Sequence, residues 1–209
     1  MPNITTVSKF IDDLFIPLAV NNIATVSSQQ TPNNNVALVA CITEFEKSLL
    51  LNALGTVTYN ALQTALANLS AADQKWKDLV NGVDYDGKSW EGLDSDKSFI
   101  CYRVYSEFLK SNNDFFTAVG NAKPNSENSS NINPTQRYVN AWHKFLKKYQ
   151  GECKKFPLDF YGYSFNWGSN FTQSEVEVSL FRFLTDKAED YAFDAGNFRF
   201  YESVNQLGL

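Results

Sequence analysis

The residues whose types and spacing could bind a metal lie in the stretch Asp84-Tyr85-Asp86-Gly87. Alternating carboxylates beside a glycine are typical of a calcium-binding loop, which places oxygen ligands at its first, third and fifth positions and a glutamate at its twelfth. Here the glycine comes too early, Lys88 stands where the third ligand belongs, and Ser95 occupies the twelfth position. The pattern therefore does not predict a metal site, and we interpret residues 84–96 as a solvated acidic loop that caps the next helix.

Residues for covalent or acid–base catalysis are as sparse as metal ligands. The single histidine, His143, needs a nucleophile and an orienting carboxylate, and Cys153, ten residues later, has no nucleophile motif around it. The closest glycines, Gly82, Gly87 and Gly92, do not follow a predicted strand and so do not form a phosphate-binding loop. We expect no catalytic residue and no cofactor, and we expect His143 to be a surface or interface residue.

One enzymatic alternative stays open because carbohydrate sites combine aromatic rings with carboxylates. Aromatic residues make up 15% of the chain, and it carries 23 acidic residues. A glycan-binding module or a glycoside hydrolase fits this composition, although no spacing selects it. The same aromatic excess is typical of large cores and of protein interfaces.

The composition bounds the class of protein. A chain of 209 residues forms one domain, or one domain with an appendage, and its net charge of −5 disfavours a surface that grips nucleic acid. The apolar stretch Leu14–Val20 is short and broken by Pro17, so it predicts neither a signal peptide nor a membrane span. Three cysteines without metal-like spacing, Cys41, Cys101 and Cys153, predict free thiols in a reducing cytoplasm.

Periodic apolar residues predict the helices that must position any site. The strongest patterns cover residues 36–54, where Val39, Ile42, Phe45 and Leu49 recur, and the helix that starts near Pro134. Three further helices are expected over 56–67, from an N-cap at Ser70 through Leu79, and from Asp96 to Lys110. The aromatic stripe of this last helix favours a core position over a ligand cage.

These elements predict a mainly α fold, a small helical bundle with a long inter-helix loop and a small α+β C-terminal extension. Residues 1–35 form an N-terminal arm, 36–152 the helical core with the loop 111–133, and 153–209 the extension. Within the extension, aromatic residues alternate with small or polar ones over 161–167 and predict a strand. The capping box Ser174-x-x-Glu177 predicts a helix through Ala188, although its alternation also fits a strand, and 198–201 is a possible short strand.

The helix after Pro134 is amphipathic and basic. Tyr138, Ala141, Trp142, Phe145 and Tyr149 form its apolar face, and the opposite face gathers lysine and arginine residues. A basic face on an otherwise acidic chain suits self-assembly between charged neighbours, and an ordinary solvated helix face explains it equally well.

An ordered set of motifs lies between Val36 and Gln150. It consists of Leu54-Gly55, Tyr59-Asn60-x-Leu62, Trp76-x-x-Leu79, Gly82, Tyr85, Trp90-Glu91-Gly92-Leu93, Tyr102-x-x-Tyr105-x-x-Phe108-Leu109, Phe116-Thr117-x-x-Gly120, Asn125-Ser126-Glu127-Asn128, Pro134 and Ala141-Trp142. This set resembles the head–tail connector proteins of tailed bacteriophages, the adaptor or ring proteins, in the form found in crAss-like phages. A weaker similarity lies in the ending Asn205-x-Leu207-Gly208-Leu209, and the strand-like segment after Lys155 has no counterpart in a minimal adaptor.

This resemblance implies a structural virion protein without catalytic residues. Its subunits are expected to form a ring, usually of twelve, at the head–tail interface, after assembly in the cytoplasm of the bacterial host. The portal protein and adjacent tail or ring proteins are the expected partners, and genomic DNA passes through the channel without sequence-specific binding. Candidate interface residues are Phe115, Phe116, Lys123, Arg137, Lys144, Lys148, Tyr163, Trp167, Leu207 and Leu209.

Overall fold

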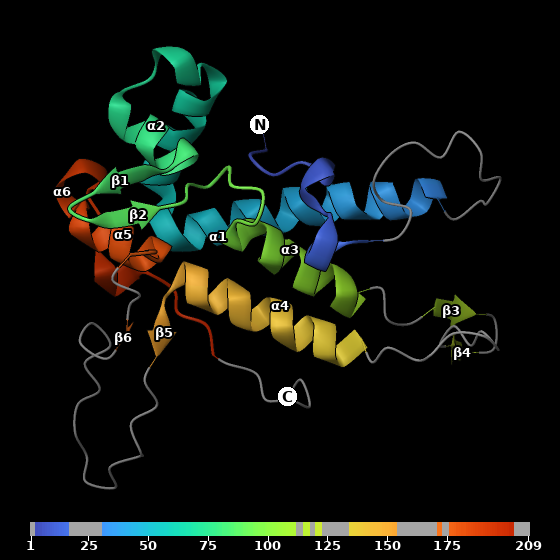
Figure 1. The fold of residues 1–209 in the computed structure, drawn as a ribbon. Helices are drawn as coiled ribbons and strands as arrows, with labels where there is room; N and C mark the ends of the chain where they lie inside the picture. Colours follow the sequence, from blue (N-terminus) through green and yellow to red (C-terminus); the bar gives the residue numbers. More distant parts are fainter. Residues whose placement is uncertain are drawn as a thin grey trace, which may run out of the picture. The chain divides into compact units, whose positions relative to one another are not determined.

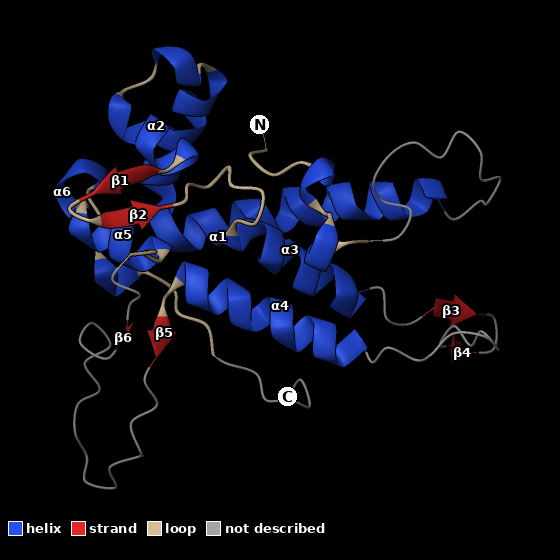
Figure 2. Cartoon of the chain, in the orientation of Figure 1, coloured by secondary structure: helices blue, strands red, loops and turns tan. Residues whose placement is uncertain are grey.

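The computed structural model describes residues 3–16, 31–111, 115–117, 120–122, 134–153, 171–172 and 176–202. These residues are mainly helical and include small antiparallel strand pairs (Figure 2), which confirms the expected fold class. In the described part of the chain, no helix is both long enough and apolar enough to cross a membrane. Of the candidate interface residues, Lys123, Tyr163, Trp167, Leu207 and Leu209 lie outside the described residues.

The chain forms two compact units, each built from separated segments. The first unit contains Met1–Leu50, Asp96–Phe145 and Glu202–Leu209, and the second contains Leu51–Ser95 and Leu146–Tyr201. Helices α1 (Thr31–Ala67) and α4 (Pro134–Tyr149) each contribute residues to both units (Figure 1). Each unit is therefore assembled from segments that are distant from one another in the sequence.

The first unit combines short N-terminal turns with three helices. Its turns are the 3₁₀ helices η1 (Val7–Lys9) and η2 (Asp12–Leu14), which precede α1, and α3 (Phe99–Ser111) follows later in the chain. Strands β3 (Phe115–Thr117) and β4 (Gly120–Ala122) pair with each other in the expected long loop. The fully buried residues of this core include Phe10, Leu14, Leu38, Ile42, Leu49, Phe99, Ile100, Val104 and Phe145.

The second unit holds most of the short elements. The end of α1 leads through η3 (Leu69–Ala71) to α2 (Gln74–Asn81) and the hairpin β1 (Val83–Tyr85) and β2 (Lys88–Trp90). After α4, strands β5 (Glu152–Cys153) and β6 (Phe171–Thr172) pair, and α5 (Leu180–Asp186), α6 (Ala188–Tyr191) and η5 (Ala195–Asn197) follow. The described ranges thus place helices and paired strands after residue 152, as expected.

Helix α1 contains the break that the sequence predicted at Gly55. This glycine has φ 72° and ψ 166°, so the helix is interrupted there although it is assigned as one element. The inward face before the break differs in one detail from the expected face, because Leu38 is buried while Val39 is exposed. Glu46 also lies on this inward face, one turn after Ile42, and is buried.

Several helices begin at residues other than the expected ones. Helix α2 begins after Asp73 and not after Ser70. Helix α3 begins at Phe99, since the hydroxyl of Ser98 accepts a hydrogen bond from the Cys101 amide at 3.4 Å. Helix α5 is capped by Ser179, whose side chain accepts a hydrogen bond from the Arg182 amide. Ser174 of the predicted capping box lies outside the described residues, and residues 176–179 are not part of a helix.

Two expectations for extended segments are also wrong. The acidic stretch after Asp84 is not a plain loop, because its first part forms the β1–β2 hairpin. Residues 198–201 form no strand, since the Arg199 amide bonds the Asn52 carbonyl and the Tyr201 amide bonds the Gln150 side chain.

Candidate functional site

The basic face of α4 is the first candidate interaction surface. Arg137 and Lys144 are exposed and Lys148 is half-buried. The Lys144 ammonium bonds the Asp13 carboxylate at 2.6 Å, and the Lys148 ammonium bonds the Glu91 carboxylate. Two of the three charges are therefore matched by carboxylates of the same chain.

Asp13 is the centre of a cluster that attaches η2 to α3 and α4 in the first unit. Besides Lys144, the Asp13 carboxylate accepts a hydrogen bond from the Tyr102 hydroxyl at 3.0 Å and lies 3.3 Å from the Lys97 ammonium. Burial alone raises the pKa of the Asp13 carboxyl, but the hydrogen bonds from Lys144, Tyr102 and Lys97 outweigh burial and lower this pKa from 3.8 to about 2. The cluster therefore holds Asp13 charged at any ordinary pH.

Glu46 provides a second attachment in the first unit. Its two carboxylate oxygens accept hydrogen bonds from the backbone amides of Ile4 at 2.8 Å and Thr5 at 2.9 Å. Glu46 is only 3% exposed, and burial raises the pKa of its carboxyl despite these bonds and the nearby Lys9 ammonium. A buried carboxylate is stable only when its oxygens have partners, so Glu46 fixes the start of the chain on α1.

The aromatic stripe of α3 is part of the core, as expected. Phe99, Tyr102, Tyr105 and Phe108 are buried. On the same helix, the Arg103 guanidinium lies 4.8 Å from the centre of the Trp142 ring and pairs with Glu107 at 2.6 Å. These contacts fix α3 against α4 within the first unit.

In the second unit, α2 and the β1–β2 hairpin pack so closely that two positions admit only glycine. A Cβ atom at Gly82 would lie 2.6 Å from the Trp90 carbonyl oxygen, and one at Gly92 would lie 2.5 Å from the Val80 carbonyl oxygen. Both glycines have positive φ, 90° and 87°. The Trp90 indole N–H donates to the Leu79 carbonyl at 3.1 Å, which closes the same junction.

The hairpin turn itself is a two-residue turn at Asp86 and Gly87. Both have positive φ, 46° and 72°, which is the geometry that an Asp-Gly pair favours in tight hairpins. Strand β2 also pairs beyond the hairpin, because Ser89 donates to the Val176 carbonyl and accepts from the Val178 amide. An open hollow of about 570 Å³ lies along the hairpin and Val176.

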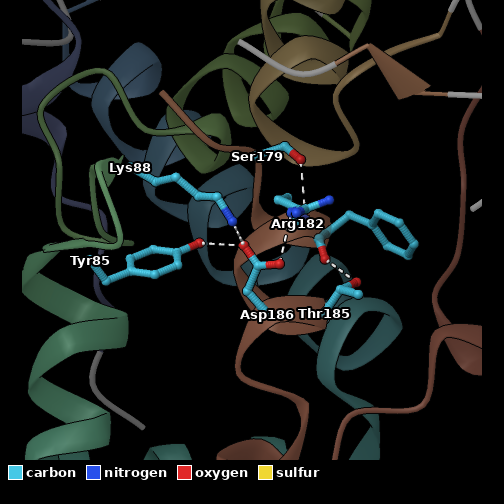
Figure 3. Close-up of polar contacts among 7 residues, drawn as sticks. Tyr85, Lys88, Ser179, Arg182, Thr185 and Asp186 are labelled. Carbon is cyan, nitrogen blue, oxygen red and sulfur yellow. Dashed lines mark hydrogen bonds and ion pairs between the residues drawn. The ribbon is translucent and has the colours of Figure 1, made fainter. Parts of the chain in front are cut away.

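Asp186 joins its own helix, α5, to the β1–β2 hairpin (Figure 3). Its carboxylate accepts hydrogen bonds from the Lys88 ammonium at 2.6 Å and the Tyr85 hydroxyl at 3.1 Å. It also forms an ion pair with the Arg182 guanidinium at 2.7 Å. Burial alone raises the pKa of the Asp186 carboxyl, but the hydrogen bonds from Lys88, Arg182 and Tyr85 lower it overall. Burial and the Asp186 charge together raise the pKa of the Tyr85 hydroxyl.

Aromatic packing supports this polar cluster. The Trp90 ring stacks on Phe183 at 5.1 Å between centroids, and Tyr85 meets Phe183 edge to face at 5.8 Å. Trp76 contacts Tyr191 in the same way, with centroids 5.8 Å apart. The cluster is therefore a structural junction between the hairpin and α5–α6.

The remaining sequence-derived candidates lie on several elements. His143 is exposed on α4, and Phe115 and Phe116 belong to β3. Cys101 is buried and Cys41 half-buried, and both are free thiols, as expected. Among the described residues, no three histidine, cysteine or acidic side chains are grouped in a way that could hold a metal ion.

The sequence reasoning did not find Asp13, Glu46 or Asp186. Glu46 had a signal, because it falls on the apolar face of α1 between Ile42 and Leu49. Asp186 follows Arg182 by four residues, which is a common helical ion-pair spacing. No local sequence pattern pointed to Asp13, because its partners Lys97, Tyr102 and Lys144 are distant in the sequence.

No protein-family model, no curated protein and no solved structure matches this chain.

Proposed function

We propose that this protein is a structural component of a tailed bacteriophage, which assembles as a ring between the portal and the tail and lines the channel through which DNA leaves the particle. The portal protein and the neighbouring tail or ring proteins would be its partners. The proposal rests on the resemblance carried by residues 36–150 and on how those residues pack.

The observation that carries the proposal is the junction formed by residues 76–93. Residues of this stretch that carry the resemblance are separated in the sequence, yet Trp90 bonds the Leu79 carbonyl, and the backbones of Gly82 and Gly92 lie in contact. The pattern thus specifies one packed unit, as a fold fingerprint does.

The mainly helical fold agrees with the helical bundle that the resemblance implies. The net charge of −5 suits a channel wall, because an acidic surface does not retain the phosphate backbone of DNA. In the proposed ring, the loop 111–133, which contains Phe115 and Phe116, contacts the adjacent subunit or lines the channel. The last residues of the chain dock on the portal or on an adjacent ring.

The location of the protein tests this proposal. Gold-labelled antibodies against the full-length chain should label the head–tail junction of phage particles whose tails have been detached. Antibodies against the major capsid protein of the same phage serve as the control and should label the whole head surface. Labelling spread over the head, or found only in host material outside particles, would contradict the proposed position.

A further inference from the structure

The N-terminal residues 3–16, here called the strap, pack against the rest of the first unit, on a surface here called the socket. Phe10, Leu14 and Ile16 of the strap are at most 2% exposed. The socket is formed by α1, α4 and the residues around the start of α3. It supplies Glu46 for the amides of Ile4 and Thr5, and it supplies Lys97, Tyr102 and Lys144 for Asp13.

The hydrogen bonds and ion pairs described above join the strap to side chains of the socket, which lie on α1, α3 and α4 and just before α3. The strap of one chain can bind the socket of an identical chain, because the contacts are the same when strap and socket belong to different molecules. The strap ends at Ile16 and α1 begins at Thr31, so the fourteen residues 17–30 connect them. Fully extended, fourteen residues span roughly 45–50 Å, which sets the greatest distance over which a strap could dock on a neighbouring subunit.

The strap also has a second apolar side. Ile11 is 44% exposed and Phe15 is 51% exposed, four residues apart, while their neighbours Phe10, Leu14 and Ile16 are buried in the socket. Large apolar side chains on both sides of one short segment are expected where that segment lies between two protein surfaces.

We propose that in the assembled protein the strap of each subunit docks in the socket of the neighbouring subunit, so that adjacent copies exchange their N-terminal residues. The inference rests on the proposed ring, because a ring keeps each socket beside the strap of another copy at high local concentration. Exchange joins each subunit to the next through the strap–socket contacts, so no further interface is needed.

Cross-linking between strap and socket tests the exchange. The Asn3 amide donates to the Thr43 hydroxyl at 3.2 Å, and both side chains are exposed. The full-length chain would carry Asn3→Cys and Thr43→Cys in a background with Cys41→Ser and Cys153→Ser; Cys101 is buried and is retained. A short bis-maleimide joins the two new thiols, and denaturing electrophoresis of the assembled protein then separates linked chains.

Exchange predicts a ladder of covalently joined chains that ends at the size of the ring. Chains that are cross-linked only within themselves, in protein that is still a ring, would overturn the exchange and leave the proposed ring intact. The same internal cross-link in a monomeric protein would overturn both. Each single-cysteine variant is the matched control and should give at most pairs of chains.

A charge exchange gives an independent test. Asp13→Lys places a lysine against Lys97 and Lys144, and Lys144→Glu places a glutamate against Asp13, so each variant alone should lose assembly. In a mixture of the two variants, the strap that carries Asp13→Lys can meet the socket that carries Lys144→Glu on another copy, and alternating rings should form only if straps are exchanged. A mixture that assembles no better than either variant alone would overturn the proposal, while the doubly substituted chain shows that both changes are compatible with folding.

Discussion

In the first unit Asp13 joins the strap to α3 and α4, whereas in the second unit Asp186 joins the β1–β2 hairpin to α5. Each carboxylate binds two cations and a tyrosine hydroxyl, but the Asp13 side chain is 34% exposed and the Asp186 side chain is 17% exposed. The hairpin is also held by backbone contacts at Gly82 and Gly92, while the strap is held mainly by side chains. The first attachment therefore depends on side-chain contacts, whereas the second also depends on close contact between backbone segments.

The largest effect is expected at the hairpin junction. In Gly92→Ala the new Cβ would lie 2.5 Å from the Val80 carbonyl oxygen at a residue with φ 87°. Both strain and backbone displacement follow, so the free energy of unfolding should fall by about 3 kcal/mol. Urea denaturation measures this loss.

Gly87→Ala is the matched control for this prediction. Its φ is also positive, at 72°, but a Cβ atom there would meet nothing within 4 Å. Only the conformational cost of roughly 1–2 kcal/mol is expected. If both variants lost the same free energy of unfolding, the close backbone contact at Gly92 would add nothing to the stability of the second unit.

A smaller and local effect is expected at the strap. Glu46→Ala removes the acceptor of the Ile4 and Thr5 amides, at a cost of about 2 kcal/mol. Hydrogen exchange at these two amides should accelerate by roughly 30-fold, while amides of α5 in the second unit stay protected. Glu44→Ala, an exposed position on the same helix, is the control; unchanged exchange in Glu46→Ala would mean that the strap does not depend on Glu46.

A still smaller effect is expected at Asp186. Asp186→Asn keeps the shape of the side chain but removes the charge that binds Lys88 and Arg182, so stability should fall by about 1 kcal/mol. The pKa of the Tyr85 hydroxyl should also move down, because the Asp186 charge is one of the causes that raise it. Ultraviolet titration of the tyrosines measures this shift, with Glu189→Gln as the control. An unchanged titration curve would show that the Asp186 charge does not affect the pKa of Tyr85.

A further effect is expected in acid. The folded pKa of Asp13 is about 2 against an ordinary value of 3.8, so its contribution to stability is complete above about pH 4 and is lost as the pH falls from 3.8 to 2. Glu46 has the opposite sign, since burial raises its pKa and the folded state binds its proton more readily than the unfolded state does. Carboxyl ¹³C shifts followed from about pH 6 to about pH 1.5 check both directions, and an Asp13 midpoint near 3.8 would show that the cluster is not formed.

Local patterns in the sequence were sufficient to predict the helices. The spacing of Ala141, Trp142, Phe145 and Tyr149 predicted α4 and its buried face, and Gly55 marked the break in α1. The hairpin was missed because Asp84 and Asp86 suggested a solvated loop, although the Asp-Gly pair at 86–87 is a turn signal. The strand-like spacing of residues 198–201 misled because these backbone groups bond the helical residue Asn52 and the side chain of Gln150.

The clusters depend on contacts between distant residues, which local patterns do not contain. Asp13 and Lys144 are 131 residues apart, and Lys88 and Asp186 are 98 residues apart. The basic face of α4 was visible in the sequence, but the carboxylates that match Lys144 and Lys148 were not. A surface interpreted as free for a partner is therefore partly used within the chain.

The most direct test of the central proposal, assembly as a ring, is the native mass of the full-length protein with and without its portal. One chain has a mass of 23.6 kDa. The proposal predicts a single closed oligomer of fixed subunit number, twelve by the resemblance, either alone or when the portal is added. A stable mass of 23.6 kDa that does not change on mixing with the portal would contradict it.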